Sequence, residues 1–158
     1  MILDAFGILP LSELMLRLGI ASLFGLVLGL DRELRGHEAG YRTHMLVALG
    51  AASMTVIGLE LFLLLERIDP GSNADPLRII EGVVAAIGFL GAGVIFQQRH
   101  TVRNVTTAAN LWLCGAIGLA CGAGLYLPAA VMFGFTIAIL TGLSLIERAL
   151  RRNLDSRD

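Results

Sequence analysis

Five long apolar runs, separated by short polar segments, make up most of this chain. Each run has about 17–23 residues, enough for an α-helix to cross a hydrocarbon layer of about 30 Å. The runs are too long for the strands of a membrane barrel, and a backbone in lipid must satisfy its own hydrogen bonds. We therefore predict an all-α polytopic membrane bundle of about five transmembrane helices. The predicted spans are approximately 14–30, 43–65, 77–96, 105–122 and 125–146.

Glycine, proline and polar residues separate the runs at four places. The breaks are Gly36–Gly40, Asp69–Pro76, Gln97–Asn104 and, as a very short turn, Gly122–Pro128. No separate soluble domain is indicated, so we predict a single transmembrane domain over residues 1–158 with a short Arg-rich tail. Residues 1–12 contain Asp4 and no basic residue, which is unlike a cleavable signal peptide, so the first run is expected to remain.

Composition strengthens the membrane prediction. The 158 residues have a mean hydropathy of +0.77 and are 56% hydrophobic and 16% charged, whereas soluble domains have about 25% charged residues. A soluble core of this size could not hold so much apolar sequence, so much of it must face lipid. All 12 basic residues are arginines clustered at the ends of apolar runs, which argues against a nucleic-acid-binding surface.

The distribution of arginine predicts the orientation. Nine of the 12 arginines lie on one predicted side, in the loops after spans one and three and in the tail. The other side has Arg67 and Arg78, while Arg17 lies inside the first span. The positive-inside rule then places the N-terminus outside and the C-terminus in the cytoplasm.

Small residues four positions apart recur in the predicted spans, and such pairs let helix backbones approach closely in lipid. They are common in polytopic proteins, so they indicate packing and do not by themselves define a site. The residues expected to pack helices are Gly25, Gly29, Gly88, Gly91, Ala92, Gly118 and Gly122, with Gly134 and Ala138 as a further pair.

Polar residues gather where spans one, two and four reach the predicted cytoplasmic side. Asn110 lies about one turn inside the bilayer, and a buried amide there needs hydrogen-bonding partners from other helices. The cluster is either an interhelical clasp or a small polar cavity, open to the cytoplasm, for an ion or a partner's side chain. Its residues are Asp31, Arg32, Glu33, Arg42, Thr43, His44, Thr106, Thr107 and Asn110.

Charges near the outer ends of the spans give a weaker signal. Glu13 and Arg17 are four residues apart on one helix, so they can pair and extend toward the surface. Interfacial charges in water are the simpler interpretation, and an acidic vestibule that attracts a cation such as magnesium is the alternative. Glu60 and Glu81 are weak candidate metal ligands.

No sequence motif indicates an enzyme. GxSxG, HExxH and P-loop patterns are absent, and the glycines of Gly88–Gly93 lie inside a predicted span with no strand before them. Cys114 and Cys121 are about 10 Å apart along a helix, too far for a disulfide, and no Cys/His cluster accompanies them. We expect buried cysteines, no catalytic residues and no cofactor.

Several strings of residues occur here in an order and spacing that one known family shares. They are Leu28–Glu33 (LGLDRE), Ala39–His44 (AGYRTH), Leu46–Ala51 (LVALGA), Ile87–Ile95 (IGFLGAGVI), Thr106–Ala109 (TTAA) and Leu111-Trp112. Together they resemble the MgtC/SapB family of bacterial inner-membrane proteins over roughly residues 14–145. The chain departs from the family at Asp31, where Glu is usual, and at Ala86, where Gly is usual. Asp keeps the carboxylate but retracts it by a methylene, so a shared charge role survives better than a shared geometry.

The resemblance implies a role in magnesium limitation, acid or envelope stress at the bacterial inner (cytoplasmic) membrane. It also implies action by binding and modulating other membrane proteins. The chain resembles a short form, without the cytosolic C-terminal domain of longer MgtC proteins, so functions of that domain are not transferred. The role in magnesium limitation follows from the resemblance alone.

Two functions remain open. The first is a non-enzymatic regulator that contacts the lipid bilayer and forms a homo-oligomer, with a dimer favoured, or binds other membrane proteins. The alternative is a small transporter or channel for a cation, such as magnesium, or for protons. The residues expected to serve such transport are Asp31, Glu33, His44, Thr107 and Asn110.

Overall fold

Five helices account for most of the chain in the computed structural model, which describes residues 9–71, 73–98 and 101–155. The helices are α1 (Leu11–Leu34), α2 (Tyr41–Ile68), α3 (Leu77–Val94), α4 (Val105–Gly122) and α5 (Tyr126–Asp155). This arrangement confirms the predicted all-α polytopic bundle. Each helix overlaps one predicted span, and the turn before α5 is the short segment 123–125.

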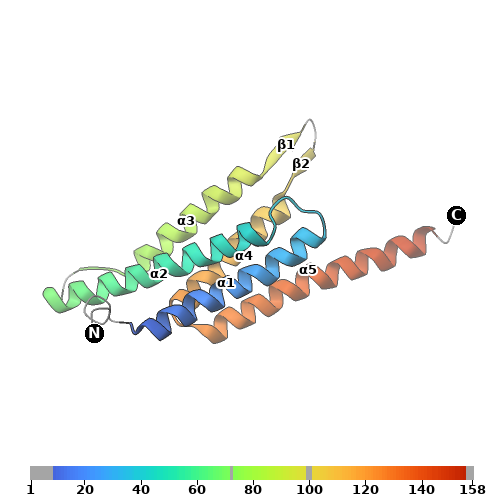
Figure 1. Ribbon diagram of the computed structural model, residues 1–158. Coiled ribbons are helices and arrows are strands. Elements are labelled where there is room, and N and C mark those ends of the chain that lie inside the picture. The colour runs from blue at the N-terminus through green and yellow to red at the C-terminus, as the bar shows by residue number, and fades with distance from the viewer. Residues whose placement is uncertain (1–8, 72, 99–100, 156–158) are drawn as a thin grey trace.

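The segment between α3 and α4 differs from the simple break predicted at Gln97–Asn104. α3 ends at Val94, and an antiparallel hairpin follows, formed by β1 (Phe96–Gln98) and β2 (Thr101–Arg103). Helical periodicity could not reveal this hairpin because its strands are only three residues long. We call the end of the bundle that carries it, together with the α1–α2 loop, the hairpin end (Figure 1). The other end, with the α4–α5 turn, is the opposite end.

α4 is the central helix, because it contacts each of the other four (Figure 1). In its apolar window 61% of residues are buried, compared with 11% for α3. The core around α4 combines Ile117 of α4 with small and large side chains of its neighbours, including Leu28, Ala48 and a stacked ring pair, Phe24 and Phe133. α3 packs mainly on α4 and stands further from α2.

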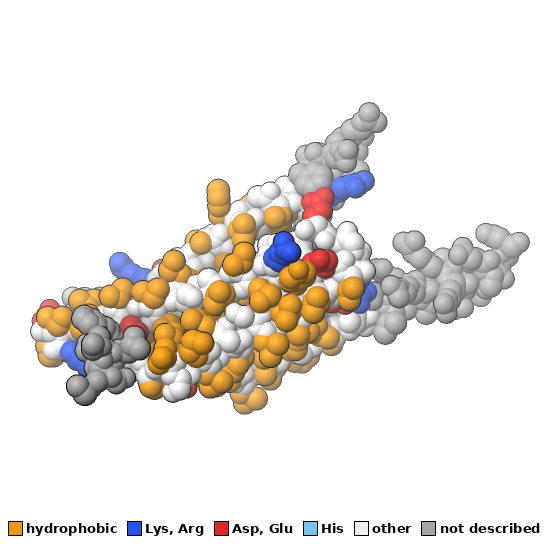
Figure 2. Space-filling model, viewed as in Figure 1, with side chains coloured by type: hydrophobic (Ala, Val, Ile, Leu, Met, Phe, Trp, Pro, Cys, Tyr) orange, Lys and Arg blue, Asp and Glu red, His pale blue; other side chains and the backbone are white. Residues whose placement is uncertain are grey.

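The outer surface is apolar over most of the bundle's length (Figure 2). Four helices, α1 to α4, are long and apolar enough to cross a membrane. Among the residues whose side chains the structure describes, α5 contributes the apolar segment Tyr126–Gly142. The chain is therefore a membrane protein, while five spans and the direction of its termini stay predictions.

A glycine-dependent turn ends α1 and reverses the chain. Gly36 has a φ of +76°, its N–H bonds to the carbonyl of Glu33, and the N–H of His37 bonds to the carbonyl of Arg32. This is the Schellman pattern, which satisfies the last carbonyls of a helix. It brings α2 back antiparallel to α1.

Four glycines of the predicted packing set allow close backbone contact. A Cβ added to Gly25 would lie 2.7 Å from the carbonyl oxygen of His44, and one at Gly118 would overlap the backbone of Ala48. Side chains at these positions would push α2 away from α1 or α4. Gly29 and Gly122 meet the backbone of Tyr41 and Ala52 in the same way.

The remaining small residues of the set behave differently. Gly91 makes ordinary contact with Ala108, at 3.7 Å from an added Cβ. Gly88 and Gly134 have no described atom within 4 Å of an added Cβ, and Ala92 and Ala138 are exposed. These two pairs therefore mediate no close backbone packing within the described part of the chain.

Candidate functional site

His44 lies at the centre of the predicted polar cluster, completely buried. Its Nδ1 is 2.9 Å from the carbonyl oxygen of Gly40, which can only accept, so Nδ1 carries the hydrogen. Nε2 then accepts a bond of 2.9 Å from Nδ2 of Asn110. Cys114 adds a bond of 3.2 Å from Sγ to the carbonyl oxygen of His44. His44 is therefore a neutral hydrogen-bonding link between α2 and α4.

Arg32, in the last turn of α1, is a charged residue that is only 4% exposed. Its Nη2 donates to Oγ1 of Thr107 at 2.8 Å, while its Nε has no partner among the described residues. The neighbouring carboxylate, Asp31, forms its ion pair with Arg35 instead, at 2.8 Å. Asp31 acts on Arg32 through its charge but makes no direct ion pair with it in the described contacts, so desolvation of the buried guanidinium is only partly offset.

Two more buried atoms of this region have no partner in the described chain: Oδ2 of Asp31 and Oδ1 of Asn110. Asn110 also lines a cavity of about 100 Å³ between α4 and α5, with Thr106 and Thr136. Native proteins leave few buried polar groups without partners, and those few mark strained or functional sites or places for water or ions. The cluster thus contains a hydrogen-bonded pair, His44 with Asn110, next to buried polar atoms that have no hydrogen-bond partner among the described residues.

The structure brings some of the predicted cluster together and separates the rest. Arg32, His44, Thr107 and Asn110 meet in the interior, and we call them the hairpin-end cluster. Glu33, Arg42 and Thr106 are exposed, Thr43 is half-buried on α2, and Asp31 is engaged with Arg35. The sequence could not predict that the Gly40 carbonyl is the partner of His44, because every residue has a backbone carbonyl.

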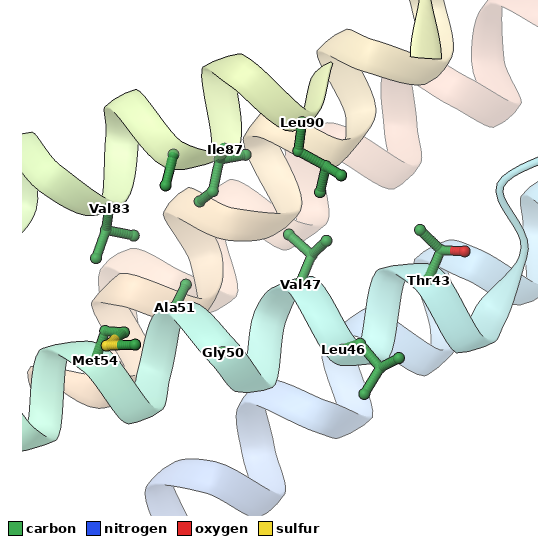
Figure 3. Close-up of a pocket in the computed structure, with 10 residues that line it drawn as sticks. Thr43, Leu46, Val47, Gly50, Ala51, Met54, Val83, Ile87 and Leu90 are labelled. Atoms are coloured by element: carbon green, nitrogen blue, oxygen red, sulfur yellow. The ribbon is translucent and has the colours of Figure 1, made fainter. Parts of the chain in front are cut away.

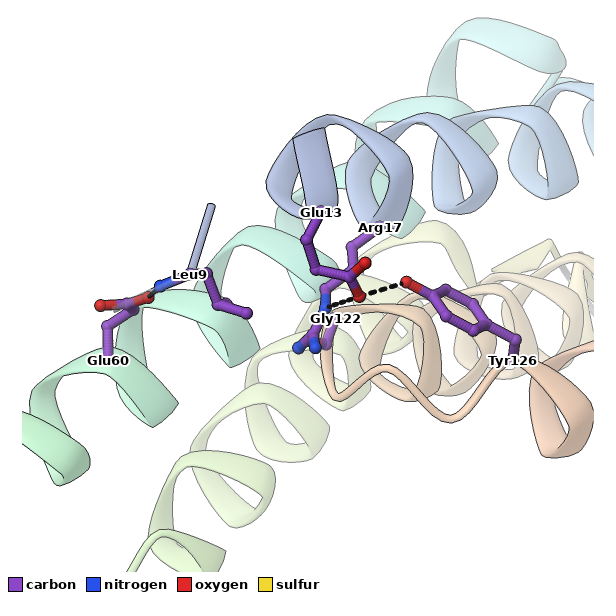
Figure 4. A network of polar contacts seen from close by, with 6 residues as sticks. All are labelled: Leu9, Glu13, Arg17, Glu60, Gly122 and Tyr126. Carbon is purple, nitrogen blue, oxygen red and sulfur yellow. Dashed lines mark hydrogen bonds and ion pairs between the residues drawn. The ribbon is translucent and has the colours of Figure 1, made fainter. Parts of the chain in front are cut away.

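A second polar network, at the opposite end, joins α1, α4 and α5 (Figure 4). Arg17 Nε lies 2.9 Å from Oε1 of Glu13, and Arg17 Nη1 donates to the carbonyl oxygen of Gly122 at 2.8 Å. The hydroxyl of Tyr126 donates to the same Glu13 oxygen at 2.7 Å. We call these four residues the opposite-end clasp. The Glu13/Arg17 pair exists as expected, but Arg17 turns onto the end of α4, where a helix leaves its last carbonyls free.

The weak metal candidates do not form a metal centre in the described residues. Glu60 Oε1 accepts the N–H of Leu9 at 2.6 Å, and Glu81 is exposed on α3. Nowhere in the ranges that the structure describes do three His, Cys, Asp or Glu side chains gather as a metal site requires.

Asn104 ties the hairpin end together. It is the residue before α4 and has a left-handed φ of 66°. Its Nδ2 donates to the carbonyl oxygen of Val94 at 3.2 Å and to Oε2 of Glu38 at 3.1 Å. The α1–α2 loop, the end of α3 and the start of α4 are thereby held next to each other.

An apolar groove of about 500 Å³ separates α2 from α3 (Figure 3). It extends from Thr43 to Met54 on α2 and from Val83 to Leu90 on α3, and we call it the α2–α3 groove. A polar pocket of about 490 Å³, the loop pocket, lies at the α1–α2 loop. Thr43 lines both, so the groove and the pocket adjoin at this residue.

The sequence of this chain matches a known protein family. The model of the MgtC family matches residues 18–149. Protein MgtC of Brucella abortus (strain 2308) is 41% identical over 130 residues, covering 82% of this chain and 51% of that protein. Protein SapB of Bacillus subtilis (strain 168) is 33% identical over 144 residues, covering 89% and 59%. YhiD of Escherichia coli (strain K12), whose name proposes a magnesium transporter, is 36% identical over 118 residues, covering 73% and 53%.

The chain spans about half the length of the curated relatives it matches. No solved structure matches it at a significant level. The matched region includes all of α2, α3 and α4 and both the hairpin-end cluster and the groove. The resemblance to MgtC and SapB proteins is thereby confirmed, and the chain belongs to the MgtC family.

Proposed function

We propose that this protein is a non-enzymatic membrane protein that binds and modulates another membrane protein through the outward face of α3. This face carries Gly82, Ala85, Phe89 and Ala92, which recur at helical spacing and are all exposed. Gly88 lies beside them, and Phe89 is 84% exposed. The face is the single observation that carries the proposal.

The use of small residues elsewhere in the same chain supports this role. The space beside Gly25 and Gly118 is occupied by the backbone of a neighbouring helix, whereas Gly88 has nothing described within 4 Å of an added Cβ. In lipid, apolar surface alone does not drive helices together, and small residues matter because they permit close packing. A face of this kind on the least buried of the four long apolar helices fits a partner helix from another protein or from a second copy.

The biological setting we propose is that of the family: a bacterial inner membrane under magnesium limitation, acid or envelope stress. The proposed orientation places the hairpin end and its arginines in the cytoplasm, as the positive-inside rule requires. Modulation through a helix face needs no catalytic group and no cofactor, which agrees with a sequence that lacks enzyme motifs.

Co-purification after cross-linking in the membrane tests the proposal. Gly88→Leu fills the outward face of α3, and Gly19→Leu is the matched control, because Gly19 is also exposed with nothing within 4 Å of an added Cβ. The wild-type chain and the control should carry a defined partner or a second copy, and Gly88→Leu should lose it. A monomeric wild-type chain without any partner, or unchanged binding by Gly88→Leu, would overturn the proposal.

A second candidate function, cation or proton transport, is favoured by the name of the E. coli relative and by the unpartnered buried atoms Asp31 Oδ2 and Asn110 Oδ1. The guanidinium of Arg32 lies in the same region and opposes a cation by its charge. Reconstituted vesicles with ion-sensitive dyes test this function. Flux that Asn110→Ala abolishes would favour transport, and the absence of magnesium or proton flux would remove it.

A further inference from the structure

The length of the α2–α3 groove corresponds to one leaflet of a bilayer. From Thr43 to Met54 the groove follows α2 for about 16 Å at the helical rise of about 1.5 Å per residue. A bilayer's hydrocarbon layer is about 30 Å thick, so one leaflet contributes about half of that. The groove therefore begins near the hairpin end and stops close to the middle of the bundle. A transmembrane partner helix would need a surface along the whole span, whereas one acyl chain needs only this length.

The lining of the groove suits an acyl chain. Val47, Ala51, Val83, Ile87 and Leu90 project into it from α2 and α3 (Figure 3). These side chains offer dispersion contacts and no hydrogen-bonding group. Thr43 is the polar residue of the lining, and it lies at the hairpin end, where a lipid chain would meet its headgroup.

The adjoining loop pocket contains charges of both signs. Arg42 Nε donates to the hydroxyl of Tyr41 at 3.3 Å, and its guanidinium lies 5.7 Å from the centre of that ring. These contacts hold Arg42 at the pocket near the charge of Glu33, and its Nη groups make no hydrogen bond within the described residues. Arginine with free Nη donors is well suited to bind a phosphate.

Two carboxylates of the pocket are held in place as well. Glu33 Oε2 accepts the N–H of Tyr41 at 3.2 Å, and Glu38 Oε2 accepts Nδ2 of Asn104 at 3.1 Å. A carboxylate has about four lone-pair sites, so each can still accept from a primary ammonium group. One guanidinium and two carboxylates around one pocket complement a headgroup with both a phosphate and an ammonium.

We propose that the groove and the loop pocket together bind one aminophospholipid of the phosphatidylethanolamine type. One acyl chain occupies the α2–α3 groove, the phosphate bonds to Arg42, and the ammonium bonds to Glu33 and Glu38. An anionic headgroup without an ammonium would face the two carboxylates and bind less well. This site lies on the side of α3 that faces α2 and is separate from its outward face, so it stands independently of the proposed function.

Lipid exchange followed by native mass spectrometry tests the site. The full chain, stripped of lipid in detergent, is given equal amounts of phosphatidylethanolamine, phosphatidylglycerol and phosphatidylcholine with identical acyl chains. One bound phosphatidylethanolamine per chain, retained in preference to the other two, is the expected result. Equal retention of the three, or a preference for phosphatidylglycerol or phosphatidylcholine, would overturn the assignment.

Four variants locate the lipid. Arg42→Gln should weaken phosphatidylethanolamine binding about tenfold, the effect of losing a charge-assisted hydrogen bond. Glu38→Gln should reduce the preference for phosphatidylethanolamine over phosphatidylcholine. Both residues are exposed, so the fold tolerates these changes.

Ala86→Phe fills the groove and should displace the lipid, whereas Ala85→Phe, on the outward face of the same helix, should retain it. The same pair separates the two proposals, because Ala85→Phe is expected to disturb the partner and not the lipid. Lipid binding that survives both Arg42→Gln and Ala86→Phe would place it elsewhere and refute the site.

Discussion

The two ends of the bundle both contain polar side chains among apolar helices, but they differ in how completely these side chains are hydrogen-bonded. In the opposite-end clasp, Glu13 pairs with Arg17, while Tyr126 and the Gly122 carbonyl complete the network. In the hairpin-end region, Arg32 has one hydrogen bond from Nη2, and a buried atom each of Arg32, Asp31 and Asn110 has no described partner.

This difference separates a structural network from a candidate functional one. Paired and hydrogen-bonded charges can hold helices together, whereas an unpaired buried charge destabilises the fold that contains it. The opposite-end clasp should therefore stabilise the bundle. The hairpin-end region, where one atom each of Arg32, Asp31 and Asn110 has no described partner, should contribute less to stability.

The largest effect is expected from Arg17→Met. The variant removes the bond to the Gly122 carbonyl and the ion pair with Glu13, and we expect it to lower the free energy of unfolding by about 2–3 kcal/mol. Reaction of the buried thiols of Cys114 and Cys121 with a labelling reagent during a thermal ramp reports unfolding. Arg78→Met, at an exposed arginine of the same end, is the control and should change little.

Tyr126→Phe should have a smaller effect at the same end. It removes only the hydroxyl that donates to Glu13, a loss of about 1 kcal/mol. Thermal unfolding of Tyr126→Phe, Arg17→Met and the double variant gives a coupling energy. Because both residues bind the same carboxylate oxygen, the effects should not be additive. Strict additivity would show that the clasp does not act as one network.

Arg32→Met should affect stability less than either change and distinguishes the two ends directly. Desolvation of the buried guanidinium opposes folding, and its one described hydrogen bond recovers only part of that cost, so we expect a change of less than about 1 kcal/mol or an increase. The same thiol-labelling measurement applies. A loss as large as that of Arg17→Met would mean that the hairpin-end cluster is a structural clasp as well.

The smallest effect concerns His37 in the α1–α2 loop. Partial desolvation and then the positive charges of Arg32 and Arg35 lower the pKa of His37 from its ordinary value of 6.5. Because the folded state disfavours the charged ring, stability should fall slightly as pH decreases below about 6.5. NMR titration of the ring should give a midpoint below that value, and Arg35→Gln should raise it. A midpoint above 6.5 would show that desolvation and the charges of Arg32 and Arg35 do not dominate the pKa of His37.

Much of the fold could be predicted because a backbone surrounded by lipid must form its own hydrogen bonds. Apolar runs of sufficient length must be helices, and the observed ends of α2 and α4 lie within a few residues of the predicted spans. The hairpin between α3 and α4 was not predictable in this way, since three-residue strands carry no periodic signal.

The polar cluster was only partly predictable. Thr107, Asn110 and Cys114 recur at helical spacing on one face of α4, and the structure buries all three. Which residues meet across helices depends on rotation and depth of each helix, which sequence spacing within one helix does not contain. Arg32 therefore meets Thr107, while the adjacent Glu33 is exposed and bonds to the backbone of Tyr41.

Hydropathy and side-chain size are properties of single positions, so the membrane environment, the helices and the small residues that let them approach follow directly from the residue order. Which of these small residues pack helices depends on how the helices are arranged in space. Gly118 lies against α2, whereas Gly88 faces away from the bundle, although both stand in similar motifs. The arrangement of the helices also pairs the polar groups of the opposite-end clasp with one another and leaves one atom each of Arg32, Asp31 and Asn110 without a described hydrogen-bond partner. A hydrogen bond between helices requires two groups at about 3 Å, and the packing of whole helices sets that distance.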